Sequence, residues 1–276
     1  MAVQTWLSVL YIALIPSFLQ AQDAVESKPI TIEFVADRNY PPLMFVEGDT
    51  LKGFLIEIVH AVDSELADYN INISASKWQT AKAKIKRGNA LGIIGPYFRG
   101  HEWEYMYPYS YPIMYEVLVT VCNKDTLAQL PAEATWPDDY RGLKIGTVGA
   151  YGGWLDSGID YEVKGMANFF EFPDAAFAIQ GVENDVVNCT LFEQGAYTAV
   201  KEKAERAGAE SLNAYLGTII SYHSIHIGYS QTAIDSQAHP YARDFIKSFD
   251  LALFKLLRSG KLTPIYEKYG VAKRFF

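Results

Sequence analysis

Short apolar stretches alternate with amphipathic ones along the first part of this chain, and this alternation restricts the fold more than any other feature. Residues 30–36, 71–73 and 91–94 are strand-forming runs that are too short for helices. Between them, a helix with one apolar face is predicted from Gly53, and a shorter helix over 79–87. Strand, helix, strand, helix, strand in this order predicts a doubly wound α/β lobe with a largely parallel sheet.

The same pattern restarts in the second half of the chain. Further strands are predicted over residues 117–122, 144–148, 185–188 and 225–229. Two helices are expected after them. Pro240 suits the first turn of one that ends at Gly260, and Pro264 begins another that ends at Gly270. Because no low-complexity linker separates the halves, we expect two lobes joined by strand crossings rather than by a flexible tether.

The N-terminal residues predict export. Residues 6–19 are apolar, but this stretch is shorter than the ~18 residues that a membrane-spanning helix needs. It is typical of the core of a signal peptide over residues 1–21 with cleavage after Ala21, although residues 1–27 lack the usual basic start. The first cysteine is Cys122, so no lipid anchor is expected at the mature N-terminus. We therefore expect a soluble protein in the periplasm.

Charge and missing motifs narrow the function. The net charge of −8 argues against a nucleic-acid partner, which requires a basic surface. No nucleophile elbow, zinc-protease helix, P-loop or dinucleotide fingerprint occurs, so we expect neither an enzyme nor a cofactor. His223 and His226 lie three apart on a predicted strand and would face opposite sides, which argues against a metal site.

The chain contains two cysteines, Cys122 and Cys189. Export would permit a disulfide between them. The alternative is two small buried hydrophobic side chains, because nothing in the sequence shows that the two residues meet.

Four segments carry motifs in a defined order. They are Asp37-Arg38-Asn39-Tyr40-Pro41-Pro42, Gly53-Phe54 followed by Glu57, Tyr109-Ser110-Tyr111-Pro112, and Ser259-Gly260-Lys261 followed by residues 265–270. In this order they resemble the D-x-x-Y-x-P, G-F-D-x-D/E, F-S-D-P and S-G-x … I-Y-x-K-Y/W-G motifs of the bacterial solute-binding protein family 3, the periplasmic receptors for polar amino acids. The resemblance covers roughly residues 29–271.

This resemblance implies a type II periplasmic-binding-protein fold. Two α/β lobes, each a mainly parallel sheet flanked by helices, would be joined by hinge crossings and enclose a ligand. Residues 28–112 plus 228–276 would form the first lobe, and residues 113–227 the second. The resemblance also implies a monomer that binds a small polar ligand and docks, when closed, on a membrane permease or a membrane sensor protein.

Receptors of this family hold an α-amino acid between an aromatic ring, an acid and an arginine. Trp78 falls where the family has its aromatic ring, with a core tryptophan as the alternative. Asp37 and Tyr40 match positions at the end of the first strand, where ligands of α/β sheets bind. The alternative for Asp37 is to cap a turn.

The arginine is out of register. The family's carboxylate-binding arginine falls near Trp103 in this chain, and the nearest arginine is Arg99. Arg99 either takes that role through a shift of the loop or is a surface residue. Tyr97, at the end of the third strand, is a further candidate for the ligand site.

The second lobe departs further from the family pattern. The family's acid for the ligand ammonium falls on Cys189 or Thr190, and the first carboxylate after the predicted strand is Glu193. Tyr151 and Gly152 match a loop whose backbone N–H groups receive an anion, with a plain glycine turn as the alternative.

Three functions remain in competition. The first is delivery of a ligand to a permease, the second is sensing of a ligand for a membrane receptor, and the third, disfavoured by the missing catalytic motifs, is catalysis. Two ligand classes also remain. Either Asp37 or Glu193 supplies the missing acid for an amino acid, or the ligand is another small polar molecule that lacks the zwitterionic head.

Overall fold

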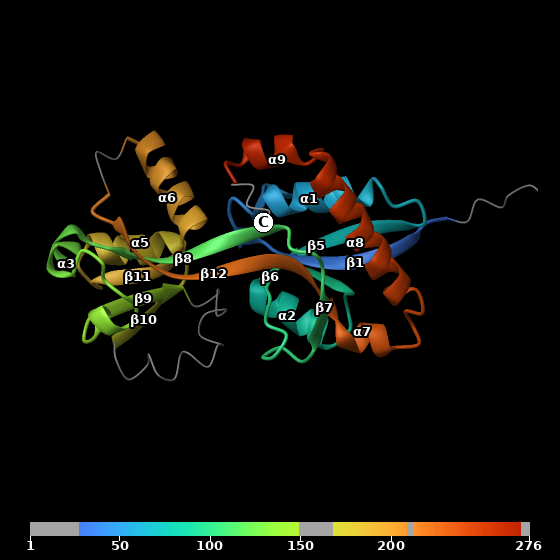
Figure 1. The fold of residues 1–276 in the computed structure, drawn as a ribbon, viewed down its shortest axis with the longest axis horizontal. Coiled ribbons are helices and arrows are strands. Elements are labelled where there is room, and N and C mark those ends of the chain that lie inside the picture. The colour runs from blue at the N-terminus through green and yellow to red at the C-terminus, as the bar shows by residue number, and fades with distance from the viewer. Residues whose placement is uncertain (1–27, 149–167, 209–211, 272–276) are drawn as a thin grey trace, which may run out of the picture.

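The structure is a computed structural model that describes residues 28–148, 168–208 and 212–271. Its main feature is a nine-stranded sheet in the order β10-β9-β11-β8-β12-β6-β1-β5, with β7 paired to β12 beside this path. Figure 1 shows two bodies of helices and strands, and β8 and β12 run from one body into the other. The expected fold class, two α/β lobes joined by crossing strands, is confirmed. The expected signal peptide lies outside the described residues.

The first lobe contains the strands predicted near the N-terminus. Its elements are β1 (Ile30–Asp37), β5 (Tyr69–Ser76), β6 (Gly92–Tyr97), β7 (Met106–Tyr109), α1 (Phe54–Asp63), α2 (Trp78–Lys86), α7 (Gln231–Asp235), α8 (Ala242–Ser259) and α9 (Thr263–Lys268). Strand β1 lies between β5 and β6 and is parallel to both. Helix α1 contacts α8 and α9, and α2 contacts α7, so the two groups cover opposite faces of the sheet (Figure 1).

Aromatic packing fastens the C-terminal helix α8 to the N-terminal strand β1. The ring of Phe34 lies 5.8 Å from the ring of Phe245 and 5.9 Å from that of Phe249. All three side chains are fully buried. Such rings contribute both buried apolar area and favourable edge contacts. The two ends of the described chain therefore share one core.

A small antiparallel sheet, β2 (Asn39–Tyr40), β3 (Met44–Glu47) and β4 (Thr50–Lys52), lies between β1 and α1. These three strands were not predicted from the sequence. Gly53 ends this sheet and caps α1 with a φ of 127°. A Cβ atom at Gly53 would also collide with the backbone of Leu43. Glycine is therefore required at this position on both counts.

The second lobe contains β9 (Lys144–Val148), β10 (Asn168–Phe172), β11 (Cys189–Glu193), α3 (Lys124–Gln129), η1 (Asp138–Tyr140), α5 (Ala175–Glu183) and α6 (Gln194–Arg206). Strand β9 is parallel to both β10 and β11.

The predicted strand over 185–188 is wrong. The amide groups of Val186 and Val187 bond to the carbonyl of Gly181, and Asp185 has a φ of 57°. These residues end helix α5, and the strand begins at Cys189. The two valines follow an apolar pattern because Val187 is buried, but a left-handed residue next to them cannot lie in a strand.

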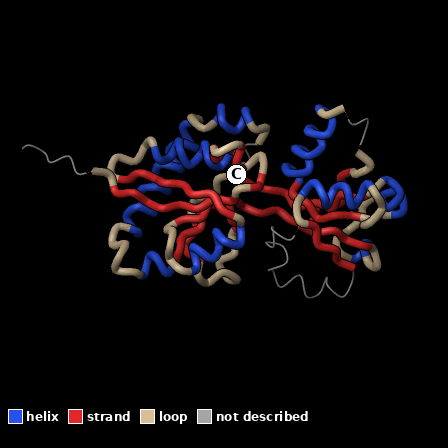
Figure 2. The backbone as a smooth tube through the Cα atoms, turned by 180° about the vertical axis from the view of Figure 1, so that it is seen from behind, coloured by secondary structure: helices blue, strands red, loops and turns tan. Residues whose placement is uncertain are grey.

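Two long strands connect the lobes. Strand β8 (Met114–Cys122) pairs with β11 of the second lobe, and β12 (Tyr215–Ser230) pairs with β6 of the first. The two strands are antiparallel and pair with each other over most of the length of β8. Figure 2 shows these strands running without a break from one body into the other. In the described part of the chain, no helix is long and apolar enough to cross a membrane.

Cys122 and Cys189 form a disulfide. The two residues lie directly opposite each other on the antiparallel strands β8 and β11. The alternative of two separate thiols therefore does not hold. The bridge fastens the second lobe to a crossing strand.

We predict that reduction of this disulfide lowers the free energy of unfolding by about 2–4 kcal/mol, because the bridge closes a long loop and restricts the unfolded chain. The two cysteines are 67 residues apart in sequence. Urea unfolding with and without a reductant measures the difference. The double variant Cys122→Ser, Cys189→Ser serves as the control and should not respond to the reductant. Equal midpoints for the oxidised and reduced wild-type protein would contradict the prediction.

Candidate functional site

The carboxyl ends of strands from both lobes meet at one cavity. Strand β1 ends at Asp37, β6 ends at Tyr97, and β11 of the second lobe ends at Glu193. Helix α2 begins at Trp78, and Tyr40 lies on β2. The cavity has a volume of about 40 Å³ and is lined by Asp37, Tyr40, Met44, Trp78, Gly95, Tyr97, Trp103 and Glu193. We call it the inner cavity. Five of the nine predicted ligand-site residues lie together here.

A wider cavity opens beside the inner one. It has a volume of about 590 Å³ and shares Asp37 and Trp78 with the inner cavity. Its other walls come from both lobes and include Lys77 of the first lobe and Asp174 of the second. We call it the outer cavity. Together the two form a narrow end and a wide end of one interlobe site.

Asp37 and Trp78 each line the inner cavity and also take the alternative role predicted for them, a turn cap for Asp37 and a core side chain for Trp78. Asp37 accepts a hydrogen bond from the backbone N–H of Asn39 at 3.1 Å, so its carboxylate caps a turn and also lines the cavity. Trp78 is 9% exposed and packs in the core of the first lobe, and it also lines both cavities. In each case one side chain serves both purposes.

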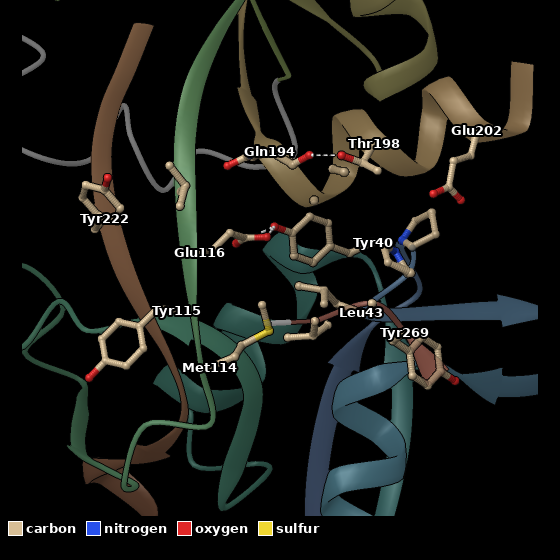
Figure 3. A pocket seen from close by; sticks show the side chains of 17 residues that line it. Tyr40, Leu43, Met114, Tyr115, Glu116, Gln194, Thr198, Glu202, Tyr222 and Tyr269 are labelled. Carbon is tan, nitrogen blue, oxygen red and sulfur yellow. Dashed lines mark hydrogen bonds between the residues drawn. The ribbon is translucent and has the colours of Figure 1, made fainter. Parts of the chain in front are cut away.

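Glu116 is a site residue that the sequence analysis missed. It lies on the crossing strand β8 and is buried. The hydroxyl of Tyr40 lies 2.8 Å from both carboxyl oxygens of Glu116, and the hydroxyl of Tyr97 lies 2.8 Å from Oε2. Figure 3 shows the Tyr40 side chain pointing at this carboxyl group. Glu116 is thus held by two tyrosines of the first lobe. The sequence does contain a signal for Glu116, because it is the one acid in a strand of mostly apolar residues. Buried charges are rare without a partner or a function.

His223 completes the cluster. It lies opposite Glu116 in the pairing of β8 with β12, so both side chains point to the same face of the sheet. Its ring stacks on Tyr97, with ring centroids 4.3 Å apart and 8° between the planes. In the described residues, no group of three or more His, Cys, Asp or Glu side chains is arranged to hold a metal ion.

Burial raises the pKa of the acids in this cluster, so they ionise less readily than acids on the surface. Burial and then the nearby charge of Glu193 raise the pKa of Glu116 to about 8. Burial raises the pKa of Glu193 to about 7, and it also raises the pKa of Asp37. Burial and then Arg99 lower the pKa of His223 to about 4, so this ring is neutral at neutral pH. The site therefore contains partly protonated acids and a neutral histidine.

The other predicted site residues lie elsewhere. Arg99 is buried, and its Nη1 forms an ion pair with Glu102 at 2.9 Å. It is not among the residues that line the two cavities. Thr190 is the second residue of β11 and donates to the carbonyl of Gly146 at 3.1 Å, because the strand begins later than expected. Tyr151 and Gly152 lie outside the described residues.

A third space, a groove of about 600 Å³, has the Tyr40–Glu116 contact in its wall (Figure 3). Its walls include Met114 and Tyr222 of the crossing strands and Thr198 of α6. The groove shares Tyr40 with the inner cavity but contains neither Asp37 nor Trp78. The inner cavity is the candidate ligand site because it joins the strand ends of both lobes.

Comparison with known proteins agrees with this architecture. The chain matches the sequence model of the bacterial extracellular solute-binding proteins, family 3, over residues 32–272. No curated protein is significantly similar to it in sequence.

Several solved structures share its fold. A histidine kinase sensor domain with similarity to periplasmic binding proteins is 16% identical, with a TM-score of 0.70 over 88% of this chain and 97% of its own. A substrate-binding protein of an ABC uptake transporter from Streptococcus pneumoniae, with bound histidine, is 19% identical, with a TM-score of 0.68 over 88% and 95%. The GluR0 ligand-binding core with L-glutamate is 14% identical, with a TM-score of 0.67 over 88% and 99%.

Because these acids are buried, we predict that the free energy of unfolding falls as the pH rises from 6.5 to 8. Folded Glu116 keeps its proton up to about pH 8, whereas an ordinary glutamate has a pKa of 4.5. Between pH 6.5 and 8 the folded state therefore binds more protons than the unfolded state. The resulting stabilisation is complete below pH 4.5 and is lost as the pH rises through 8. His223 acts in the opposite direction, because its lowered pKa adds stability above pH 6.5 that is lost as the pH falls towards 4.

The variant Glu116→Gln tests this prediction, because glutamine keeps an oxygen acceptor for the two tyrosines and does not titrate. Between pH 6.5 and 8, the free energy of unfolding should fall by about 1–2 kcal/mol less in Glu116→Gln than in the wild-type protein. Urea unfolding at a series of pH values measures the slope. Glu47→Gln, at an exposed position, is the matched control and should keep the wild-type slope. Identical slopes for Glu116→Gln and the wild-type protein would contradict the prediction.

Proposed function

The chain belongs to the bacterial extracellular solute-binding proteins, family 3, and we propose that it captures a small polar ligand between its lobes and presents it to a membrane transporter. The observation that carries this proposal is the inner cavity, whose walls come from the strand ends of both lobes. A ligand bound there would contact both lobes at once and so favour the closed arrangement.

The proposal includes lobe boundaries, location and oligomeric state. Residues 28–112 with 228–276 form one lobe and residues 113–227 the other, with β8 and β12 as the hinge. The protein is exported by its N-terminal residues, acts in the periplasm as a monomer, and has a binding role rather than a catalytic one. The similarity to a substrate-binding protein of an ABC uptake transporter supports a role in transport.

A sensor role is the second candidate function. The similarity to the sensor domain of a histidine kinase supports it, since that domain has the same fold and a TM-score of 0.70. The two roles use the same ligand-driven closure and differ in the membrane partner. Uptake of the labelled ligand by cells with and without this protein separates them, because a sensor would leave the initial rate of uptake unchanged.

We predict that the ligand compacts the protein. Small-angle scattering of the purified protein, before and after removal of the molecule retained through native purification, measures the radius of gyration. The radius should be smaller with the ligand, because the hinge strands allow the lobes to approach. Identification of that molecule by mass spectrometry accompanies the measurement. An unchanged radius would argue against binding between the lobes.

Trp78→Ala should weaken ligand binding by about 1–3 kcal/mol, the usual range for a buried aromatic contact at a binding site. Trp78 lines both cavities, so its ring is available to the ligand. Calorimetric titration gives the affinity, and a thermal melt gives the stability. The matched control is Trp136→Ala, because Trp136 packs on Tyr140 in the second lobe, outside both cavities. Normal affinity in Trp78→Ala together with a lower melting temperature would show that Trp78 serves the core alone.

A further inference from the structure

We propose that the inner cavity binds the ammonium group of an organic amine, and that the preferred ligands lack the α-carboxylate of an amino acid. This inference rests on the proposed binding function and names the chemical class of the ligand. It follows from the charges and rings of the cavity wall, and from the position of the nearest arginine.

The described wall of the inner cavity contains acids but no lysine or arginine. Asp37 is 5% exposed and Glu193 is 6% exposed. Among the described residues, neither forms an ion pair with a basic side chain. A third acid, Glu116, lies directly behind the tyrosines of the wall. Buried carboxylates are unfavourable without a positive partner, so a ligand cation would supply the missing charge.

Aromatic rings form most of the remaining wall. Tyr40, Trp78, Tyr97 and Trp103 all line the cavity. The face of an aromatic ring attracts a cation, most strongly when water is excluded, and clusters of such rings with acids recognise alkylated ammonium groups. The aromatic rings and the acids therefore both favour a positively charged ligand.

The arginine that would bind a carboxylate does not line this cavity. Arg99 and Trp103 belong to one turn, in which the Trp103 amide donates to the Arg99 carbonyl at 3.0 Å. Trp103 lines the cavity, whereas the Arg99 guanidinium is paired with Glu102. The nearby ammonium group of Lys82 lies 5.1 Å from the Trp103 ring, and Lys82 is not a lining residue. At this point of the wall a ligand would contact the aromatic ring of Trp103 and not the guanidinium group of an arginine.

The size of the cavity agrees with a small head group. A volume of about 40 Å³ holds only a few heavy atoms, since one water already needs roughly 10–15 Å³ on the same measure. The outer cavity, at about 590 Å³, has room for the rest of the ligand. It is also more polar in character, because its walls include the exposed Arg38 and Lys77 as well as Asp174. We infer that the ammonium group lies inside and that the remainder of the amine points outwards.

Matched pairs of amino acids and amines test this inference, because the members of each pair differ only by the carboxylate. The probes are L-arginine with agmatine, L-histidine with histamine, and L-lysine with 1,5-diaminopentane. Calorimetric titration of the full mature chain, freed of retained ligand, gives the affinities. We expect at least one amine to bind tenfold or more tightly than its amino acid. Equal or tighter binding of the amino acid in every pair would overturn the inference and would indicate that the carboxylate finds a cation such as Arg99.

Charge-neutral variants test the role of the acids. Glu193→Gln and Asp37→Asn should each weaken the binding of the best amine tenfold or more, while a thermal melt shows that each variant is folded. Glu47→Gln removes an exposed carboxylate that lines neither cavity and should keep the wild-type affinity. Unchanged amine affinity in both cavity variants would overturn the inference.

The failure of this inference is distinguishable from failure of the proposed function. If the molecule retained through native purification is an amino acid, a sugar or an anion, and it compacts the protein, binding between the lobes stands and the amine class is wrong. If no probe binds, no molecule is retained and no compaction occurs, both are wrong.

Discussion

The antiparallel pairing of β8 with β12 is the interaction on which the rest of this structure depends. Every backbone N–H and C=O group that is buried needs a partner, and these two strands satisfy that need for each other where the lobes meet. Because β8 also pairs with β11 and β12 with β6, one sheet runs through both lobes. The same ladder places Glu116 opposite His223 at the junction. The junction of the lobes and the Glu116–His223 pair beside the inner cavity therefore depend on the same ladder of hydrogen bonds.

A continuous sheet explains how a site can have walls from two lobes and still be well defined. Asp37 and Tyr97 are placed by the parallel pairing of the first lobe, and Glu193 by the pairing of β11 with β8. The Tyr40 and Tyr97 hydroxyls reach across to Glu116 on the crossing strand. A change in the angle between the lobes would have to alter these contacts. In this structure, the hydrogen bonds to the Glu116 carboxyl group thus connect the crossing strand β8 with the inner cavity.

The electrostatic character of the site follows from burial rather than from its residue types alone. Glutamate and aspartate on a surface would be ionised and solvated, whereas burial raises the pKa of Asp37 and Glu193 in the wall of the inner cavity and of Glu116 behind it. The neutral state of His223 has the same cause. A cavity with several acids and no described basic side chain in its wall is well suited to a cation. The acidic net charge of the whole chain, by contrast, carries no information about this cavity.

Much of the fold and part of the site could be predicted from the sequence, because periodic apolar residues, prolines and glycines act locally. The strands at 30–36 and 144–148, the helix start at Gly53 and the helix end at Gly260 all follow from such local signals. Asp37, Tyr40 and Trp78 were predicted from the resemblance to the family motifs and Tyr97 from the end of a strand, and all four line the inner cavity. The strand near residue 185 was misplaced, since apolar character alone does not separate a buried turn from a strand.

Non-local contacts decided the rest. The pairing of Cys122 with Cys189 and the burial of Glu116 between two tyrosines depend on residues far apart in the chain. The sequence by itself determined most of the elements and the strand ends at which the inner cavity lies, because these depend on neighbouring residues. Only the tertiary structure decided which side chains meet there and with what charge, because pairing and burial depend on how the two lobes pack around the crossing strands.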